Sequence, residues 1–126
     1  MNDFNIKIEY KHVPRFDSGS KESVDYLESE GYVIIKNALT AEEASKTLDL
    51  LWDYLENLGT GIDRANPMTW SDDKWPTCAH GGIIPSYGIG HSEAQWFVRG
   101  VPNVKKAFAK VWETDDLLTS FDGVSL

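Results

Sequence analysis

The sequence contains few of the features that mark secreted, membrane or nucleic-acid-binding proteins. Its one cysteine, Cys78, excludes a disulfide within these 126 residues and predicts a reducing, intracellular and cytoplasmic setting. The longest apolar run is Tyr32–Ile35, and the opening residues lack an apolar stretch of signal-peptide length, so no targeting signal and no membrane span are predicted. Twelve Lys and Arg against twenty Asp and Glu leave a net charge of −8 and no basic stripe, which argues against a nucleic-acid partner.

The sequence does contain enough apolar and aromatic residues for a folded core. Hydrophobic residues make up 41% of the chain, with five each of Trp, Tyr and Phe, and this composition argues against disorder. A chain of 126 residues fits one domain or part of one. Residues 1–19 alternate weakly before a turn and predict an N-terminal arm, either an edge strand or a segment that docks elsewhere on the protein.

Two helices and a strand are predicted in the first half of the chain. Residues 20–30 have helical spacing, and Gly31 follows them as a residue that readily ends a helix in the left-handed conformation. The run Tyr32–Ile35 predicts a strand inside a sheet. A capping box at Thr40–Glu43 starts a longer helix that ends at Gly59. The apolar stripe of this helix predicts core packing through Ala44, Leu48, Leu51, Trp52, Leu55 and Leu58.

Residues 59–92 follow neither a helical nor a strand period. They hold six of the ten glycines and three of the five prolines, together with Trp70, Trp75 and Tyr87. Long irregular segments are uncommon in compact domains unless they are functional or disordered. Disorder would leave these aromatic side chains in water, so the sequence favours a loop that packs onto a pocket.

His91 and Glu93 form the one pair of a histidine and a carboxylate separated by a single residue. On a strand such a pair shares a face and can bind one metal ion, whereas on a helix the two side chains diverge. The residues Ser92–Gln95 form a second capping box, which places the pair at a helix start. No metal site is therefore predicted, and His80 stands at a spacing that matches no metal-binding pattern.

Two helices follow this box. The first carries Trp96 and Arg99 and ends at Gly100, and Pro102 opens the second. Arg99 is a candidate clamp for a carboxylate or an acyl-CoA phosphate, with an ordinary surface ion pair as the alternative. The apolar positions of the second helix are Val104, Phe108, Val111 and Trp112, with lysines predicted on the solvent side.

The last ten residues, Leu117–Leu126, predict a strand that no turn, charge or proline closes. Complete proteins rarely leave an apolar strand with an open edge, because such an edge invites aggregation. We therefore expect a chain truncated within its domain, with an edge at Leu117–Leu126 that is open to self-association.

Several motifs together resemble the N-terminal part of phytanoyl-CoA dioxygenase-like proteins. The opening EGYVIIKNALT at residues 30–40 is moderately specific, and LLTSFDG at 117–123 strengthens the match. Between them the matching stretches are Gly90-His91-Ser92, Trp96 through Arg99, and Pro102-Asn103-Val104. The resemblance runs from about Val24 to the end of the chain.

This resemblance implies an α+β fold, with an N-terminal helical layer and the first strands of a double-stranded β-helix (jelly-roll or cupin-like) oxygenase. Residues 1–126 would form a single partial domain, in which 20–126 is the N-terminal part of the oxygenase domain. Such enzymes hydroxylate a carbon with iron(II) and 2-oxoglutarate, and two histidines and one aspartate hold the iron.

The family's His-x-Asp motif does not occur in this sequence. No catalytic or metal-ligating residue is therefore assigned, and neither iron(II) nor 2-oxoglutarate is expected to bind this chain tightly alone. His91 matches the family's GHS histidine as a residue of the pocket or the scaffold. The candidates for lining a substrate pocket are Trp75, Tyr87, His91, Trp96, Arg99, Ser120 and Asp122.

Two functions from different classes remain open. In the first, the chain is the N-terminal part of an Fe(II)/2-oxoglutarate-dependent hydroxylase whose substrate is a small molecule such as a lipid or an acyl-CoA. In the second, it is a non-catalytic binding protein derived from that fold, which engages a partner through the edge at Leu117–Leu126.

Overall fold

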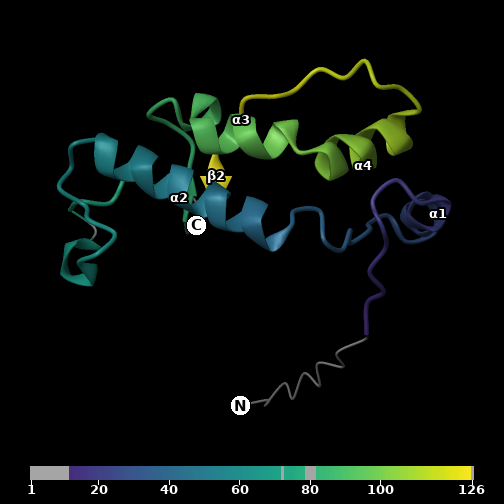
Figure 1. Ribbon diagram of the computed structural model, residues 1–126, viewed down its shortest axis with the longest axis horizontal. Helices are drawn as coiled ribbons and strands as arrows, with labels where there is room; N and C mark the ends of the chain where they lie inside the picture. The colour runs from purple at the N-terminus through teal and green to yellow at the C-terminus, as the bar shows by residue number, and fades with distance from the viewer. Residues whose placement is uncertain (1–11, 72, 79–81, 126) are drawn as a thin grey trace, which may run out of the picture.

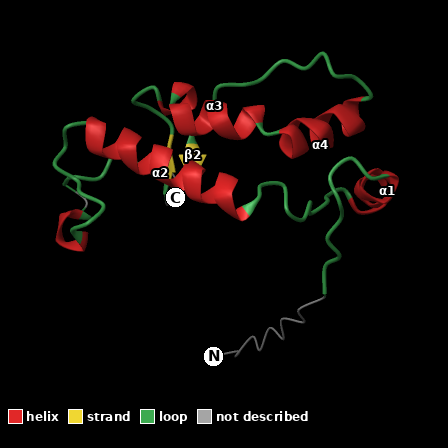
Figure 2. Ribbon diagram, viewed as in Figure 1, coloured by secondary structure: helices red, strands yellow, loops and turns green. Residues whose placement is uncertain are grey.

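The computed structural model describes residues 12–71, 73–78 and 82–125. Helices make up most of the regular secondary structure, and both strands are short (Figure 2). In chain order the elements are α1 (Lys21–Glu30), α2 (Ala41–Asn57), η1 (Pro67–Thr69), β1 (Ile83–Ile84), η2 (Ile89–His91), α3 (Glu93–Gly100), α4 (Pro102–Trp112) and β2 (Val124–Ser125). None of the helices in these ranges is both long enough and apolar enough to cross a membrane.

Helix α1 forms as predicted and sits at one end of the molecule (Figure 1). The Ser20 hydroxyl accepts the amide proton of Ser23 at 3.2 Å, and Gly31 ends the helix with a φ of 79°. The rings of Phe16 and Tyr32 contact Tyr26 on α1, with centroids 5.0 and 5.7 Å away. This small aromatic cluster holds the helix to the segments before and after it.

The prediction that Tyr32–Ile35 lies inside a sheet is wrong. Ile35 forms a single parallel bridge with Phe16, and both Tyr32 and Ile34 are exposed. No other segment of the described chain pairs with this run, so its β-branched side chains have no sheet to enter. The part of the predicted arm at residues 1–11 lies outside the described residues.

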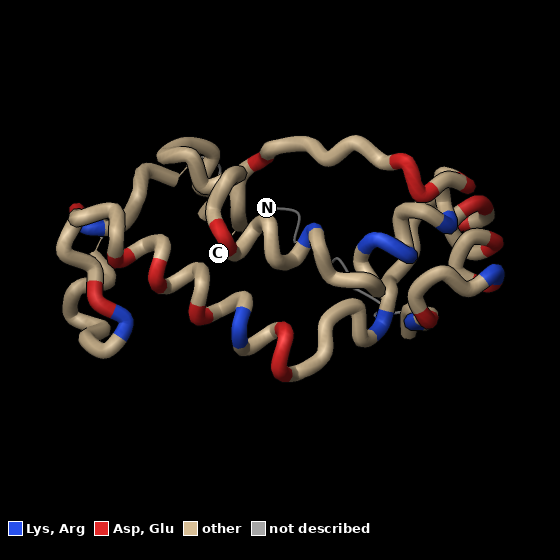
Figure 3. The backbone as a smooth tube through the Cα atoms, turned by 45° about the horizontal axis from the view of Figure 1, so that its top comes forward, with Lys and Arg blue, Asp and Glu red and all other residues tan. Residues whose placement is uncertain are grey.

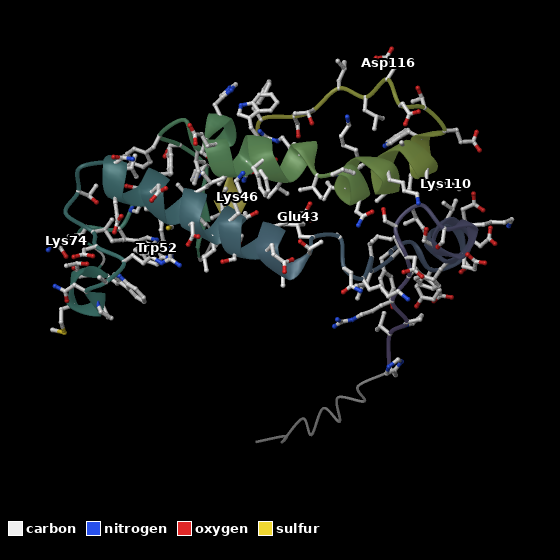
Figure 4. All side chains as sticks on the ribbon, in the orientation of Figure 1. Glu43, Lys46, Trp52, Lys74, Lys110 and Asp116 are labelled. Atoms are coloured by element: carbon white, nitrogen blue, oxygen red, sulfur yellow. The ribbon has the colours of Figure 1, made fainter. Side chains whose placement is uncertain are left out.

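Helix α2 begins with the predicted capping box. The Thr40 hydroxyl accepts from the Glu43 amide at 3.1 Å, and the Glu43 carboxylate accepts from the Thr40 amide at 2.8 Å. Acidic positions recur along this helix, where Figure 3 shows them in red. The Nζ of Lys46, which Figure 4 labels on α2, lies 4.5 Å from the ring centre of Phe97 on α3.

Replacing Thr40 with alanine is expected to lower the free energy of unfolding by about 0.5–2 kcal/mol. The change leaves the Glu43 amide without its acceptor and removes one half of the box. Urea unfolding followed by far-UV circular dichroism measures the difference. Thr60→Ala, in an exposed loop, is the control; equal effects for the two variants would mean that the cap does not stabilise α2.

Helix α3 packs on α2, and α4 continues from α3 after a sharp turn at the buried Val101 (Figure 1). The Ser92 hydroxyl accepts from the Gln95 amide at 3.4 Å, which confirms the predicted start of α3. Pro102 occupies the first turn of α4, also as predicted. After α4 the chain runs back over that helix to reach β2 beside α3 (Figure 1).

The central core combines α2 with residues that the sequence placed in an irregular loop. Its four buried members are Leu55, Ile62, Ile84 and Ile89, and only Leu55 belongs to a long helix. Partly buried residues packed around them are Leu51, Trp52, Tyr54, Leu58, Trp75 and Val124. The segment 59–92 is therefore a structural part of the core as well as a connection.

One two-stranded antiparallel sheet closes this core within the described residues, with Ile83 opposite Ser125 and Ile84 opposite Val124. Residues 117–123, predicted as the first part of the last strand, contain no regular element. The strand edge expected at Leu117–Leu126 is thus limited to Val124–Ser125, and one side of it is paired. The jelly roll implied by the family resemblance stays a prediction.

Candidate functional site

The loop before α3 and the segment before β2 meet at Gly90. A Cβ on Gly90 would lie 2.9 Å from the carbonyl oxygen of Asp122, so only a glycine allows this close approach. Next to the contact, the rings of His91 and Phe121 stack with centroids 4.2 Å apart and planes at 21°. Trp96 meets Phe121 edge-on at 5.6 Å. The motifs GHS and SFDG, thirty residues apart, thus form one structure.

Arg99 is the charged centre of this arrangement. Its Nη1 donates to the Gly90 carbonyl oxygen at 2.5 Å, which ties the end of α3 to the loop before it. The guanidinium carbon lies 5.3 Å from the Trp96 ring centre and 5.6 Å from that of Phe121, within cation–π range of both. We call His91, Trp96, Arg99 and Phe121 the arginine–aromatic cluster.

No carboxylate in the described part of the chain forms an ion pair with Arg99. The alternative of an ordinary surface ion pair therefore has no partner for Arg99 among the described residues. The hydrogen bond to Gly90 occupies one of the five guanidinium N–H groups of Arg99. The rings of Trp96 and Phe121 pack against the same guanidinium group. Arg99 is a positioned cation with donors to spare.

A cleft of about 410 Å³ lies beside the arginine–aromatic cluster, between α3, α4 and the segment that returns over α4. Figure 4 labels Asp116 on that returning segment and Lys110 on the helix beneath it. The lining residues are Gln95, Arg99, Val104, Lys105, Phe108, Trp112, Asp115, Leu117, Leu118, Thr119, Ser120, Asp122 and Gly123. A volume of this size is typical of a site for a small molecule.

The structure brings together five of the seven predicted pocket residues. Arg99, Ser120 and Asp122 line the cleft itself. His91 and Trp96 belong to the arginine–aromatic cluster on its border. Whether these residues bind a substrate stays a prediction, but their proximity supports treating them as one site.

Trp75 and Tyr87 lie elsewhere. The Trp75 ring packs edge-on, with centroids 6.2 Å apart, against Trp52 of α2, which Figure 4 labels, and it borders the core. The Tyr87 carbonyl oxygen accepts from the Tyr54 hydroxyl at 2.6 Å, and its own hydroxyl lies 3.2 Å from that of Thr77. Burial raises the pKa of Tyr54, which favours the protonated hydroxyl that donates to Tyr87. Neither residue lines the cleft of about 410 Å³, and whether either contacts a substrate stays a prediction.

Sequence reasoning missed the apolar wall of the cleft. Phe108 and Trp112 were assigned to the core-facing stripe of the last helix, yet both are exposed, and Leu118 above them is fully exposed. Helical spacing shows that the two aromatic residues share a face, but it does not show what lies opposite. The signal for this wall in the sequence was the apolar pair Leu117-Leu118 after the helix, because a short return of the chain can place these residues over α4.

The described residues do not form an iron site. No three His, Cys, Asp or Glu side chains among them are placed to hold one metal ion. His91 is in η2 and Glu93 opens α3, with Ser92 as the cap between them, as the capping box predicted. His80 lies outside the described residues. No reaction step through iron is therefore derived for this chain.

The chain is similar to two curated proteins. It is 38% identical over 120 residues to "Ava biosynthesis cluster protein O" of Aspergillus versicolor, in an alignment that covers 95% of this chain and 38% of that protein. It is 28% identical over 103 residues to a protein of Dictyostelium discoideum named "Putative phytanoyl-CoA dioxygenase", covering 78% of this chain and 29% of that protein.

No family model matches the chain, and no solved structure matches it. The chain thus spans well under half the length of the curated relatives that it matches, at 38% and 29%. The similarity to the Dictyostelium protein weakly suggests a dioxygenase-like family, in agreement with the motifs at residues 30–40 and 117–123.

Proposed function

We propose that this chain is the N-terminal, helical part of an Fe(II)/2-oxoglutarate-dependent oxygenase of the phytanoyl-CoA dioxygenase type. The observation that carries the proposal is the 28% identity over 103 residues to the Dictyostelium protein of that name. The assembly of the GHS and SFDG motifs at Gly90 supports it, because the stretches that carry the family resemblance form one site.

In this proposal the jelly roll and the sites for iron and 2-oxoglutarate belong to residues other than these 126. Helices α2, α3 and α4 would form the helical layer, and β2 would be an early strand of the sheet. The described residues would contribute one wall of the substrate pocket. Arg99 would hold a polar group of the substrate, and the apolar side chains of α4 would exclude water from it.

The nucleotide sequence after codon 126 tests this proposal first, and we expect the reading frame to continue into a His-x-Asp motif. The polypeptide that this longer frame encodes is expected to convert 2-oxoglutarate to succinate with iron(II) and substrate. Its variant with alanine in place of the motif's histidine is expected to be inactive. The 126-residue chain alone is expected to produce no succinate, because its described residues bring no three metal ligands together.

Two results would contradict the proposal. One is a stop codon at position 127. The other is an inactive longer polypeptide that binds iron(II) and 2-oxoglutarate normally and has been offered amphipathic carboxylates and their CoA esters. Succinate production by the 126-residue chain above that of its His91→Ala variant would overturn the narrower statement that this chain lacks the catalytic centre.

A non-catalytic binding role is the second candidate, and the exposure of Leu118 and Phe121 favours it. These apolar side chains lie on the segment before β2, where a partner or a second copy could cover them. A stop codon after Leu126 together with concentration-dependent dimerisation in sedimentation velocity would favour this role. Leu118→Ser is the variant that tests this role, and it is expected to weaken the dimerisation, since it removes exposed apolar surface and no core contact.

A further inference from the structure

The charged end of the cleft is fixed before any ligand arrives. Arg99 is held by the Gly90 carbonyl oxygen and by the faces of Trp96 and Phe121, and it forms no ion pair within the described residues. A guanidinium held in this way loses little conformational freedom when it binds an anion. Its planar fork of N–H donors matches the two oxygens of a carboxylate.

The opposite side of the cleft is apolar and faces solvent. Phe108 and Trp112 stand one turn apart on α4, and Leu118 lies on the segment that crosses over them. Trp112 is 68% exposed, so a ligand that covers these side chains removes a substantial apolar area from water. The cleft therefore offers a cation at one end and a hydrocarbon-binding surface along the rest.

The other charged residues that line the cleft, Lys105, Asp115 and Asp122, offset the positive charge of Arg99 only in part. Lys105 and Asp115 line both this cleft and a second hollow on α4, so they stand at the shared rim with opposite charges. The Asp122 Oδ1 accepts the Gly123 amide proton at 2.8 Å, which turns one carboxylate oxygen toward its own backbone. Gln95, Thr119 and Ser120 add neutral hydrogen-bonding groups.

We propose that this cleft binds an amphipathic carboxylate, whose carboxylate group pairs with Arg99 and whose hydrocarbon body lies on Phe108, Trp112 and Leu118. The cleft volume of about 410 Å³ accommodates a molecule of this kind. As a statement about the substrate of an oxygenase, this inference rests on the function proposed above. As a statement about binding, it concerns only side chains of this chain.

Isothermal titration of the 126-residue chain with sodium octanoate at neutral pH tests the proposal. Octanoate is expected to bind, and octan-1-ol, octylammonium and acetate are each expected to bind at least about tenfold more weakly, because each lacks one of the two features. Equal affinity for octanol and octanoate would overturn the role of Arg99. Equal affinity for acetate and octanoate would overturn the apolar surface.

Arg99→Met is expected to weaken octanoate binding by about tenfold or more, the usual loss when a charge-assisted hydrogen bond is removed. Lys110→Met is the matched control, because it removes one positive charge from the same region but lines the second hollow and not the cleft. Asp122→Asn is expected to tighten binding, since it removes the carboxylate that shares this end of the cleft. Equal losses for Arg99→Met and Lys110→Met would overturn the proposal.

Far-UV circular dichroism shows whether Arg99→Met remains folded. If it does not, Trp112→Ser decides, because this exposed residue can be replaced without opening the core. The proposal requires Trp112→Ser to weaken octanoate binding severalfold, and unchanged affinity overturns it. Octanoate binding without turnover by the longer polypeptide refutes the proposed function alone. Turnover without octanoate binding refutes this inference alone.

Discussion

Replacing Leu55 with alanine is expected to lower the free energy of unfolding by about 2–5 kcal/mol, the range for removing a large buried aliphatic side chain. Leu55 is 1% exposed and is the one member of the four-residue core that comes from a long helix. The buried cluster that it forms with Ile62, Ile84 and Ile89 connects α2 to both ends of the segment 59–92. The loss therefore affects the packing of α2, β1 and η2 at once.

Leu48→Ala is the matched control for this prediction. Leu48 lies on the same helix, two turns before Leu55, and is 48% exposed. Alanine favours the helix slightly over leucine, and shortening this partly exposed side chain leaves no cavity. The free energy of unfolding is therefore expected to change by no more than about 1 kcal/mol. Urea unfolding followed by tryptophan fluorescence measures both variants. A loss at Leu48 as large as that at Leu55 would mean that the core is centred elsewhere.

Replacing Gly123 with alanine is expected to destabilise the protein by about 1–3 kcal/mol, as an overpacked site does. A Cβ at this position would lie 2.6 Å from the carbonyl oxygen of Ile84. That oxygen belongs to the backbone of β1, which pairs with β2 immediately after Gly123, so no flexible side chain can give way. The two strands must separate, and Phe121 and Asp122 move with them away from Gly90.

Gly100→Ala controls for the general effect of adding a methyl group. Gly100 is the last residue of α3, and a Cβ there meets no atom within 4 Å. Alanine favours a helix over glycine, so this variant is expected to be unchanged or stabilised by up to about 1 kcal/mol. Thermal unfolding of the two variants distinguishes the effect of the clash at position 123 from the general effect of replacing a glycine with alanine. Equal stability of the two would contradict the close approach at Ile84.

The helix boundaries could be predicted because they depend on groups close together in the chain. Ser20, Thr40 and Ser92 each cap an amide three residues later, and Gly31 ends α1 in the left-handed region. These hydrogen bonds need no tertiary partner, so their pattern can be recognised in the residues themselves. The same reasoning placed His91 before the start of α3 and Glu93 in its first turn, with Ser92 as the cap between them.

Strands and pocket walls could not be predicted in this way, because they need partners from distant segments. Tyr32–Ile35 has the composition of a buried strand, but the described chain offers it one bridge to Phe16. Ile84 and Ile89 stand among glycines and prolines with no period, and they are buried because α2 lies over them. Trp75 was predicted to line a pocket because it is aromatic, and its contact with Trp52 places it in the core.

The candidate site shows most clearly which features depend on local sequence and which depend on the tertiary structure. By itself the sequence determined where α3 starts, that His91 precedes it and that Arg99 comes near its end, since local hydrogen bonding decides these points. Only the tertiary structure decided that Phe121 stacks on His91 and that Arg99 lies between Trp96 and Phe121. The pairing of β2 with β1 brings Phe121 there, because it returns the end of the chain to the loop before α3.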